Sequence, residues 1–313
     1  MQHKCCTAFV ISLFMPQEPL FRKGHRMIDI NTKFITLIGT PLSQSFAARM
    51  QNTGYQAAGQ NMKYFYTETD STHLKEIIDG IRYMPSFAGA AVTKPNKVEV
   101  IQYLDELDPL CRKIGACNTI VKQPDGKLKG YNTDGAGFYR SITQEGRVRI
   151  EGSTFFCFGS GGAGRAICSE LAYHGAEKIY IIDISEGSSR ALIHDINTNF
   201  APVAEYVPAG DYTLIPECNV VINASGIGMG NTVGQTPLPA EHIRPGQFYF
   251  DACYNPDKTQ FLLNAEAAGC QTLNGLGMSL YQGVVQIELW TGKNAPVDAM
   301  RQELFHILAE MKG

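Results

Sequence analysis

The residues with the clearest chemical capacity form a glycine-rich loop at positions 159–164, with the sequence GSGGAG. Its spacing matches G-x-G-x-x-G, in which the glycines permit a tight turn, close approach of a diphosphate, and close packing of a helix on a strand. The loop follows an apolar run at residues 154–158 and precedes an expected helix that ends near residue 173. The free N–H groups and the dipole of that helix would hold the diphosphate of a dinucleotide. We expect these loop residues to bind the cofactor: Gly159, Ser160, Gly161, Gly162, Ala163 and Gly164.

Asp183 ends the next apolar run, at the distance where a carboxylate binds the adenosine ribose. Such a carboxylate accepts hydrogen bonds from both ribose hydroxyls and repels a 2′-phosphate. Ile184, which follows it, offers no positive charge to such a phosphate. The pattern therefore predicts NAD rather than NADP. The alternative is that Asp183 only caps the junction of a strand and a loop, and that the glycine loop is an ordinary turn.

Three short polar segments lie upstream, at the ends of apolar runs. They read VTKPNK at residues 92–97, GACNTI at residues 115–120 and GYNTDG at residues 130–135. Ligands of α/β proteins bind at the carboxyl ends of the strands. These segments therefore indicate a second site in the first half of the chain.

The elements that must position these residues alternate between strands and helices. In the first half we expect strands at residues 34–38, 63–67 and 87–93, helices at residues 71–82 and 95–107, and a hairpin at residues 119–131. In the second half, apolar strands surround the glycine loop, and residues 274–313 become helical again. The order predicts an α/β fold. We expect an N-terminal α/β substrate domain, a Rossmann NAD-binding domain, and C-terminal helices that return to the substrate domain.

The bulk composition of the 313 residues fits two cores, because 44% are hydrophobic and 18% charged. A formal charge of −3 gives no reason to expect nucleic acid or a membrane surface as a partner. Nine cysteines without a CxxC pair indicate a reduced, cytoplasmic protein, and the seven histidines show no metal-ligand spacing. We expect no transmembrane helix. The first 26 residues are expected to be a disordered extension, or to precede a true start at Met27.

The polar segments also resemble motifs of the shikimate dehydrogenase family, from about residue 35 to residue 292. Residues 92–97 resemble the "VTxPxK" motif of the family, residues 115–119 its "GAxNT" motif, and residues 130–137 its "GxNTDxxG" motif. The resemblance implies that Lys97 and Asp134 are the catalytic pair. It also implies that Thr93 and Asn118 bind the substrate.

Further motifs follow in the same order along the chain. Asn223-Ala224 precedes residues 251–256, which are similar to "DxxYxP", and residues 275–282 resemble "GxGMLxxQ". The resemblance implies that Tyr254 and Gln282 bind the substrate. It assigns Asn223, Gly275 and Met278 to the cofactor.

The chemistry implied is hydride transfer between a nicotinamide and a ring carbon that carries a hydroxyl or ketone oxygen. Lys97 could exchange a proton with that oxygen if partial burial lowers its pKa toward the working pH, although Asp134 acts in the opposite direction. The alternative is that Lys97 is a solvated residue of a first helical turn and Asp134 a turn or N-cap residue.

Two hydrogen-bonding groups of the family pattern are missing. In the family, the two serines of the motif G-x-P-x-x-H-S-x-S-P bind the substrate carboxylate. Residues 39–48 represent this motif: Ser45 matches the first serine, which implies that it binds the substrate, but Ala47 replaces the second serine and Ala48 the proline. Ala91 replaces an asparagine. A hydrogen bond to a charged group is worth about 1.5–3 kcal/mol, so shikimate binding would weaken unless other groups replace those lost. Arg49, or the hydroxyls of Thr40 and Ser43, could bind the carboxylate, the pocket could suit quinate, or the substrate could be another ring acid; Arg49 could also be an ordinary surface residue.

The sequence thus predicts an NAD-dependent oxidoreductase that acts on shikimate, quinate or a related cyclic hydroxy acid, as a monomer or homodimer. The alternatives are a ligand-binding or regulatory protein of the same fold with weak catalysis, and a folate-type methylene dehydrogenase. The expected domain limits are residues 27–137 for the substrate, 138–273 for NAD, and 274–313 for the C-terminal helices.

Overall fold

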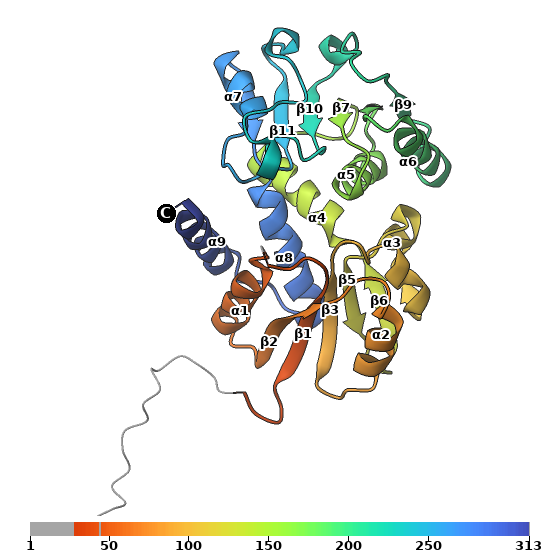
Figure 1. The fold of residues 1–313 in the computed structure, drawn as a ribbon, viewed down its shortest axis with the longest axis vertical. Coiled ribbons are helices and arrows are strands. Elements are labelled where there is room, and N and C mark those ends of the chain that lie inside the picture. Colours follow the sequence, from red (N-terminus) through yellow and green to blue (C-terminus); the bar gives the residue numbers. More distant parts are fainter. Residues whose placement is uncertain (1–27, 44, 313) are drawn as a thin grey trace, which may run out of the picture.

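The computed structural model describes residues 28–43 and 45–312 of the chain. The extension predicted for residues 1–26 lies outside the described residues. The described part contains two six-stranded sheets, one above the other in Figure 1, with helices α4 and α8 running between them.

The first sheet has the strand order β2-β1-β3-β5-β6-β4. Strand β1 pairs in parallel with β2 and β3, and β5 is antiparallel to both β3 and β6. The strands are β1 (Lys33–Gly39), β2 (Met62–Glu68), β3 (Phe87–Val92), β4 (Glu106–Leu107), β5 (Thr119–Lys122) and β6 (Leu128–Tyr131). Its helices are α1 (Ala47–Ala57), α2 (Leu74–Arg82), the 3-10 helix η1 (Glu99–Tyr103) and α3 (Pro109–Ile114). The hairpin expected at residues 119–131 is present as β5 and β6.

Both faces of the first sheet are covered, as the apolar strands require. Leu74, Ile78 and Ile81 of α2 are buried in a cluster with Ile38, so the helical periodicity of this segment packs it on one face. On the other face, Ile35 lies in a cluster with buried residues of α1, α8 and α9. Strand β1 is therefore shielded from water on both sides, which is typical of parallel strands.

The second sheet is entirely parallel, in the order β12-β11-β10-β7-β8-β9. Its strands are β7 (Thr154–Phe158), β8 (Lys178–Ile182), β9 (Ala204–Tyr206), β10 (Val220–Asn223), β11 (Phe248–Asp251) and β12 (Gln271–Leu273). Its helices are α5 (Gly162–Tyr173), α6 (Glu186–Asn199) and α7 (Gln260–Ala267), with short 3-10 helices at η3 (Ile215–Glu217), η4 (Gly230–Thr232) and η5 (Ala240–His242). This order is the Rossmann arrangement that the sequence predicted.

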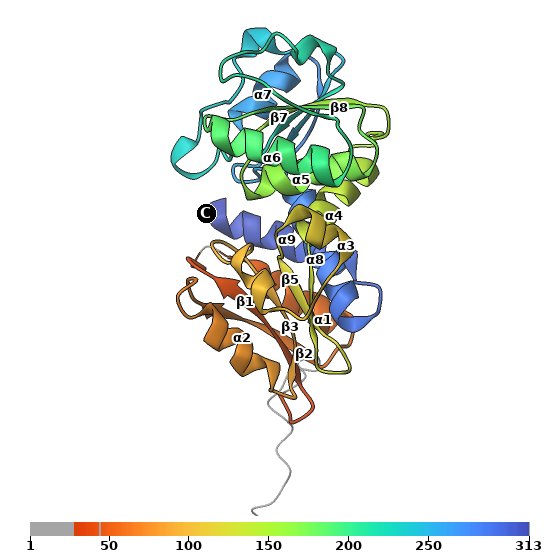
Figure 2. The same ribbon diagram turned by 90° about the vertical axis from the view of Figure 1, so that its right-hand side faces the viewer.

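Two helices join the halves. Helix α4 (Thr133–Arg140), continued by the π-helix η2 (Ser141–Glu145), leaves the first sheet, and α8 (Leu276–Thr291) returns from the second. Arg140 Nη1 and Nη2 bond the two carboxylate oxygens of Glu288 at 3.2 and 2.8 Å, which ties α4 to α8. Helix α9 (Val297–Lys312) then packs beside α1 (Figure 1), and in the view of Figure 2 it lies between the two sheets. The predicted return of the C-terminal helices to the first half is confirmed.

One expected element is wrong. The helix predicted for residues 95–107 is replaced by η1 and the short strand β4. Leu104 is extended, and Asp105 Oδ2 accepts a hydrogen bond from Leu128 N at 2.7 Å. Pairing with β6 therefore ends the helical turn before it can propagate.

No helix within residues 28–43 and 45–312 is long and apolar enough to cross a membrane. The seven cysteines at described positions are all free thiols.

Candidate active site

A polar cavity of about 230 Å³ lies between the first sheet and helices α1 and α8. Six of the residues predicted for catalysis or substrate binding line it: Ser45, Thr93, Lys97, Asn118, Tyr254 and Gln282. Tyr254 follows strand β11, so the second half of the chain also contributes to this cavity. The structure thus brings together residues that are more than two hundred positions apart.

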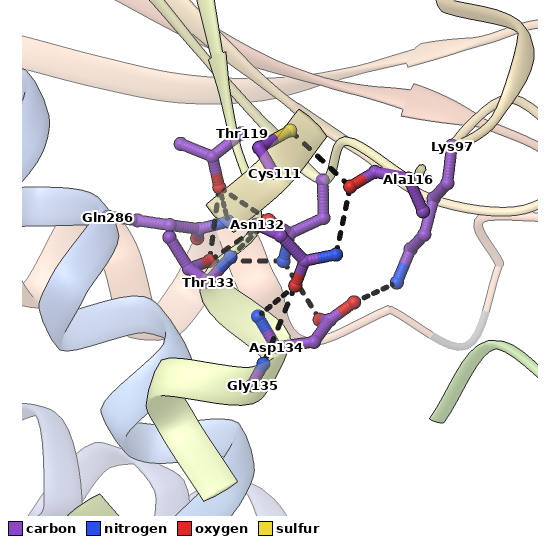
Figure 3. Close-up of polar contacts among 10 residues, drawn as sticks. Lys97, Cys111, Ala116, Thr119, Asn132, Thr133, Asp134, Gly135 and Gln286 are labelled. Carbon is purple, nitrogen blue, oxygen red and sulfur yellow. Dashed lines mark hydrogen bonds and ion pairs between the residues drawn. The ribbon is translucent and has the colours of Figure 1, made fainter. Parts of the chain in front are cut away.

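Lys97 and Asp134 form an ion pair beside the cavity. Lys97 Nζ lies 2.7 Å from Asp134 Oδ2, and the two side chains are 27% and 10% exposed. Asn132 caps α4, since its side-chain oxygen accepts hydrogen bonds from the backbone N–H groups of Asp134 and Gly135. This cap places Asp134 in the first helical turn, where the helix dipole favours a negative charge. The contact in Figure 3 is therefore built by the start of α4.

Asn118 completes the fixation of this carboxylate. Its Nδ2 donates to Asp134 Oδ1 at 2.8 Å and to Thr133 Oγ1 at 3.0 Å, while its Oδ1 accepts from Thr133 N at 2.7 Å. Asn118 is fully buried. Each oxygen of Asp134 thus has a separate donor, one from Asn118 and one from Lys97, so the carboxylate cannot rotate freely.

A row of hydrogen bonds between polar side chains on the same cavity was not predicted from the sequence. Gln286 Nε2 donates to Thr119 Oγ1 at 3.0 Å, and Gln51 Nε2 donates to Gln286 Oε1 at 3.0 Å. Both glutamines line the cavity. Gln286 follows Gln282 by four residues in one helix, a spacing that puts both on the same face and could have revealed it.

The two substituted positions also line the cavity. Ala47 and Ala91 contribute methyl groups where polar side chains were expected, so neither can hydrogen-bond a ligand. The proposed replacements are engaged elsewhere: Arg49 pairs with Glu303 and Glu310 of α9, and Thr40 Oγ1 donates to Glu68 at 2.9 Å. Neither they nor Ser43 line the cavity. Among the alternatives for Arg49, the structure therefore supports the surface residue.

A second cavity, of about 310 Å³, opens at the carboxyl ends of β7, β8 and β10. It is lined by Gly159, Gly161 and Asp183, together with mostly apolar neighbours such as Ile184 and Tyr212. A Cβ on Gly161 would meet no atom within 4 Å, so this loop position faces open space. Gly159 has φ +103°, and a Cβ there would lie 2.7 Å from the backbone of Ala224. The cradle thus has the shape that a dinucleotide needs.

The third loop glycine has the packing role that the motif predicts. A Cβ on Gly164 would lie 2.0 Å from Gly159 O, so only glycine lets α5 approach the loop this closely. Gly275 is similar, since a Cβ there would lie 2.0 Å from Ala252 O. Ser160, Gly162 and Ala163 complete the loop and the start of α5. Asn223 ends strand β10 and Met278 lies in the first turn of α8, and both are buried.

Asp183 is held by the loop itself. Its Oδ2 accepts from Ser160 N at 2.7 Å and Ser160 Oγ at 2.9 Å, and its Oδ1 accepts from Ser185 N at 2.9 Å. Burial alone would raise the pKa of Asp183, but the hydrogen bonds from Ser185 and Ser160 outweigh it and lower the pKa. The carboxylate is therefore ionised near neutral pH and joins the loop to the start of α6.

A parallel Rossmann sheet with a glycine-lined cavity, beside a separate cavity that holds a lysine–carboxylate pair, defines a two-part α/β oxidoreductase. Two family models match the chain: the shikimate dehydrogenase substrate binding domain at residues 37–120, and the shikimate 5′-dehydrogenase C-terminal domain at residues 275–305. A shikimate dehydrogenase (NADP(+)) of Desulforamulus reducens is 40% identical over 92% of this chain and 99% of its own length. The chain belongs to the shikimate dehydrogenase family, and is a dehydrogenase that acts on CH–OH groups.

Solved structures agree with this assignment. Shikimate 5-dehydrogenase from Listeria monocytogenes, in complex with shikimate and NAD, is 36% identical, with a TM-score of 0.86 over 91% of this chain and 100% of that chain. Quinate dehydrogenase from Corynebacterium glutamicum, in complex with NAD, is 29% identical, with a TM-score of 0.83 over 88% of this chain and 99% of that chain.

The preference for NAD over NADP predicted from Asp183 is wrong. Curated relatives from Desulforamulus reducens, Moorella thermoacetica and Listeria innocua are all named as NADP(+) enzymes, and one solved relative is a complex with NADP+. The prediction assumed that the charge of Asp183 faces the ribose alone. In the structure three donors from Ser160 and Ser185 partly balance that charge. An aspartate at this position is therefore a weaker argument against a 2′-phosphate than the sequence pattern suggested.

Proposed function

We propose that this protein interconverts a ring hydroxyl and a ketone of shikimate, with NADP as the cofactor. The observation that carries the proposal is the Lys97–Asp134 pair, 2.7 Å apart, beside a polar cavity that both halves of the chain line. The names of the relatives support shikimate and NADP. A pure binding protein would not require a proton donor held in this way.

In this proposal Lys97 moves the proton. When bound, the nicotinamide supplies or accepts the hydride at the ring carbon. Lys97 Nζ takes the proton of the hydroxyl during oxidation and returns it to the ketone oxygen during reduction. Asp134 holds the ammonium group at 2.7 Å and is itself held by Asn118, so the proton donor is kept in one place.

The remaining lining residues orient the ring. We assign Ser45, Thr93 and Gln282 to hydrogen bonds with the carboxylate and hydroxyls, and Tyr254 to the wall of the cavity. The edge of the Tyr254 ring packs against Phe46 at 5.6 Å between centroids, and burial raises the pKa of its hydroxyl. Tyr254 therefore stays a neutral hydrogen-bond donor.

Quinate is the second candidate substrate, and one observation favours it. The methyl groups of Ala47 and Ala91 leave room in the cavity, and quinate carries an extra hydroxyl on the carbon that bears its carboxylate. A quinate dehydrogenase is also among the relatives.

The residues of the second cavity fit a dinucleotide. We propose that the open loop position at Gly161, with Ser160, Gly162 and Ala163, holds the diphosphate, and that Asp183 and Ile184 lie beside the adenosine. Asn223, Gly275 and Met278 would shape the nicotinamide end, as the family resemblance implies. The domain limits, a cytoplasmic location and a monomeric or dimeric state stay predictions from the sequence.

A steady-state screen tests this proposal. Purified protein is given shikimate or quinate with NADP+ or NAD+, and kcat/KM is measured for the four combinations. We expect the highest value with shikimate and NADP+. The absence of turnover with both acids and both cofactors would contradict the proposal, and a higher value for quinate would favour the second candidate.

A further inference from the structure

Gln51 is a buried polar residue of the cavity that the proposed mechanism does not use. It lies in α1, is 1% exposed, and lines the cavity. Its Nε2 donates to Gly283 O at 3.2 Å and to Gln286 Oε1 at 3.0 Å. Its Oε1 is buried and has no hydrogen-bond partner among the residues that the structure describes.

The orientation of this amide follows from its neighbours. Gly283 O can only accept, so exchanging the two ends of the Gln51 amide would set two carbonyl oxygens against each other. Gln286 is oriented in turn, because Gln51 Nε2 donates to its Oε1 and leaves its Nε2 to donate to Thr119 Oγ1. The unpaired atom of Gln51 is therefore its oxygen, which can only accept a hydrogen bond.

The hydrogen bonds between Gln51 and the ion pair are all donated in the same direction. Gln51 donates to Gln286, Gln286 to Thr119, Thr119 to Asn118, and Asn118 to Asp134, which also accepts from Lys97. Bonds aligned in this way polarise one another. The row begins at an oxygen without a donor, so a hydroxyl that donated to Gln51 would complete it.

The surroundings point to a neutral hydroxyl as that donor. A buried carbonyl without a partner is unfavourable, and structures rarely retain one without a reason. Ala47 and Ala91, which line the same cavity, contribute only methyl groups and cannot supply the donor. A carboxylate would be repelled by the oxygen, whereas a ring hydroxyl can donate to it.

We propose that Gln51 is a specificity-determining residue whose Oε1 accepts a hydrogen bond from a ring hydroxyl that is not oxidised. A hydroxyl has a single proton, so one that donates to Gln51 Oε1 cannot also give that proton to Lys97. The hydroxyl at Gln51 is therefore a different one from the hydroxyl that reacts. This inference rests on the proposed function, since it concerns the substrate of the same cavity.

The test compares shikimate with two analogues, each of which lacks one of the hydroxyls that are not oxidised. For each enzyme, kcat/KM is measured with the three compounds and NADP+, and the ratio of shikimate to analogue is calculated. The enzymes are wild type and Gln51→Met, which has a similar shape but no acceptor oxygen. Gln56→Met, an exposed position of the same helix, is the control. Melting temperature and NADPH binding check that each variant is folded.

We expect the wild type to prefer shikimate over one analogue by about tenfold, the size of a lost neutral hydrogen bond. In Gln51→Met this preference falls to about twofold or less, mainly through KM, while Gln56→Met retains it. Equal ratios in wild type and Gln51→Met, or a wild type that distinguishes neither analogue, would overturn the inference. A wild type without turnover on any ring acid would instead overturn the proposed function.

Discussion

Lys97 and Asp134 have no distinctive meaning as isolated residues. A lysine after a proline and an aspartate at a helix start are common surface features, and the motif alone left both interpretations open. The structure brings them to 2.7 Å and leaves Asp134 only 10% exposed, with a second donor from Asn118. In the proposed mechanism, this geometry holds the Lys97 amine where it can exchange a proton with the substrate oxygen.

Removing the charge of Asp134 should mainly affect turnover. In Asp134→Asn an amide replaces the carboxylate that orients Lys97, so we expect kcat to fall by about 10²-fold or more, with a smaller change in KM. The control is Asp125→Asn, an exposed position in the hairpin turn, where kcat should stay within about twofold of wild type. Equal kcat values in the two variants would show that Asp134 has no part in the reaction.

Asp183 predicts an acid dependence of stability. The pKa of its carboxyl in the folded state lies below the ordinary value of 3.8, so its stabilising contribution is fully present above pH 3.8 and is lost as the pH falls through the lowered pKa. Melting temperatures of wild type and Asp183→Asn should differ by a constant amount near neutral pH and converge in acid. A constant difference down to the lowest pH at which the protein folds would contradict this.

At the level of elements, the local sequence predicts those features that the local backbone geometry requires. The glycine loop was predictable because two of its positions require glycine for local reasons. Gly159 has a positive φ, and at Gly164 the backbone of the loop approaches too closely for a Cβ. The helix expected at residues 95–107 failed because strand β4 pairs with β6, a contact that the local pattern does not contain.

Gly164→Ala should separate α5 from the loop. The added Cβ would lie 2.0 Å from Gly159 O, and since that oxygen belongs to the backbone, we expect a loss of about 1–3 kcal/mol in unfolding free energy. NADP binding should weaken as well. Gly187→Ala in α6, where a Cβ meets nothing within 4 Å, should be neutral or stabilise by up to about 1 kcal/mol. Denaturant unfolding of both variants measures this, and equal stabilities would contradict the packing argument.

At the scale of the whole molecule, the active site is assembled by helices that connect two sheets. The row from Gln51 to Gln286 joins residues 235 positions apart, and no local pattern pairs them. Sequence could therefore predict six residues of the cavity through their motifs. It could not predict Gln51, whose neighbours depend on how α1 packs against α8.

Gly137→Ala tests this assembly. A Cβ at Gly137 would lie 2.5 Å from Met278 O and 2.7 Å from Gln282 N, so α4 and α8 would have to separate. We expect a loss of about 1–3 kcal/mol in stability and a fall in kcat/KM, because α4 carries Asp134 and α8 carries Gln282. Gly80→Ala in α2, where a Cβ meets nothing within 4 Å, should leave kcat/KM unchanged. A Gly137→Ala enzyme with wild-type stability and kcat/KM would show that the contact is not required.

The most direct test of the account is the initial rate of NADPH formation from shikimate and NADP+ by three proteins: wild type, Lys97→Ala and Lys94→Ala. Lys94 is an exposed lysine three residues from Lys97, so its removal controls for a general change of charge. We expect turnover in wild type and Lys94→Ala, and a kcat lower by about 10²–10⁴-fold in Lys97→Ala with shikimate binding retained. Equal rates for Lys97→Ala and Lys94→Ala, or no NADPH from the wild type, would contradict it.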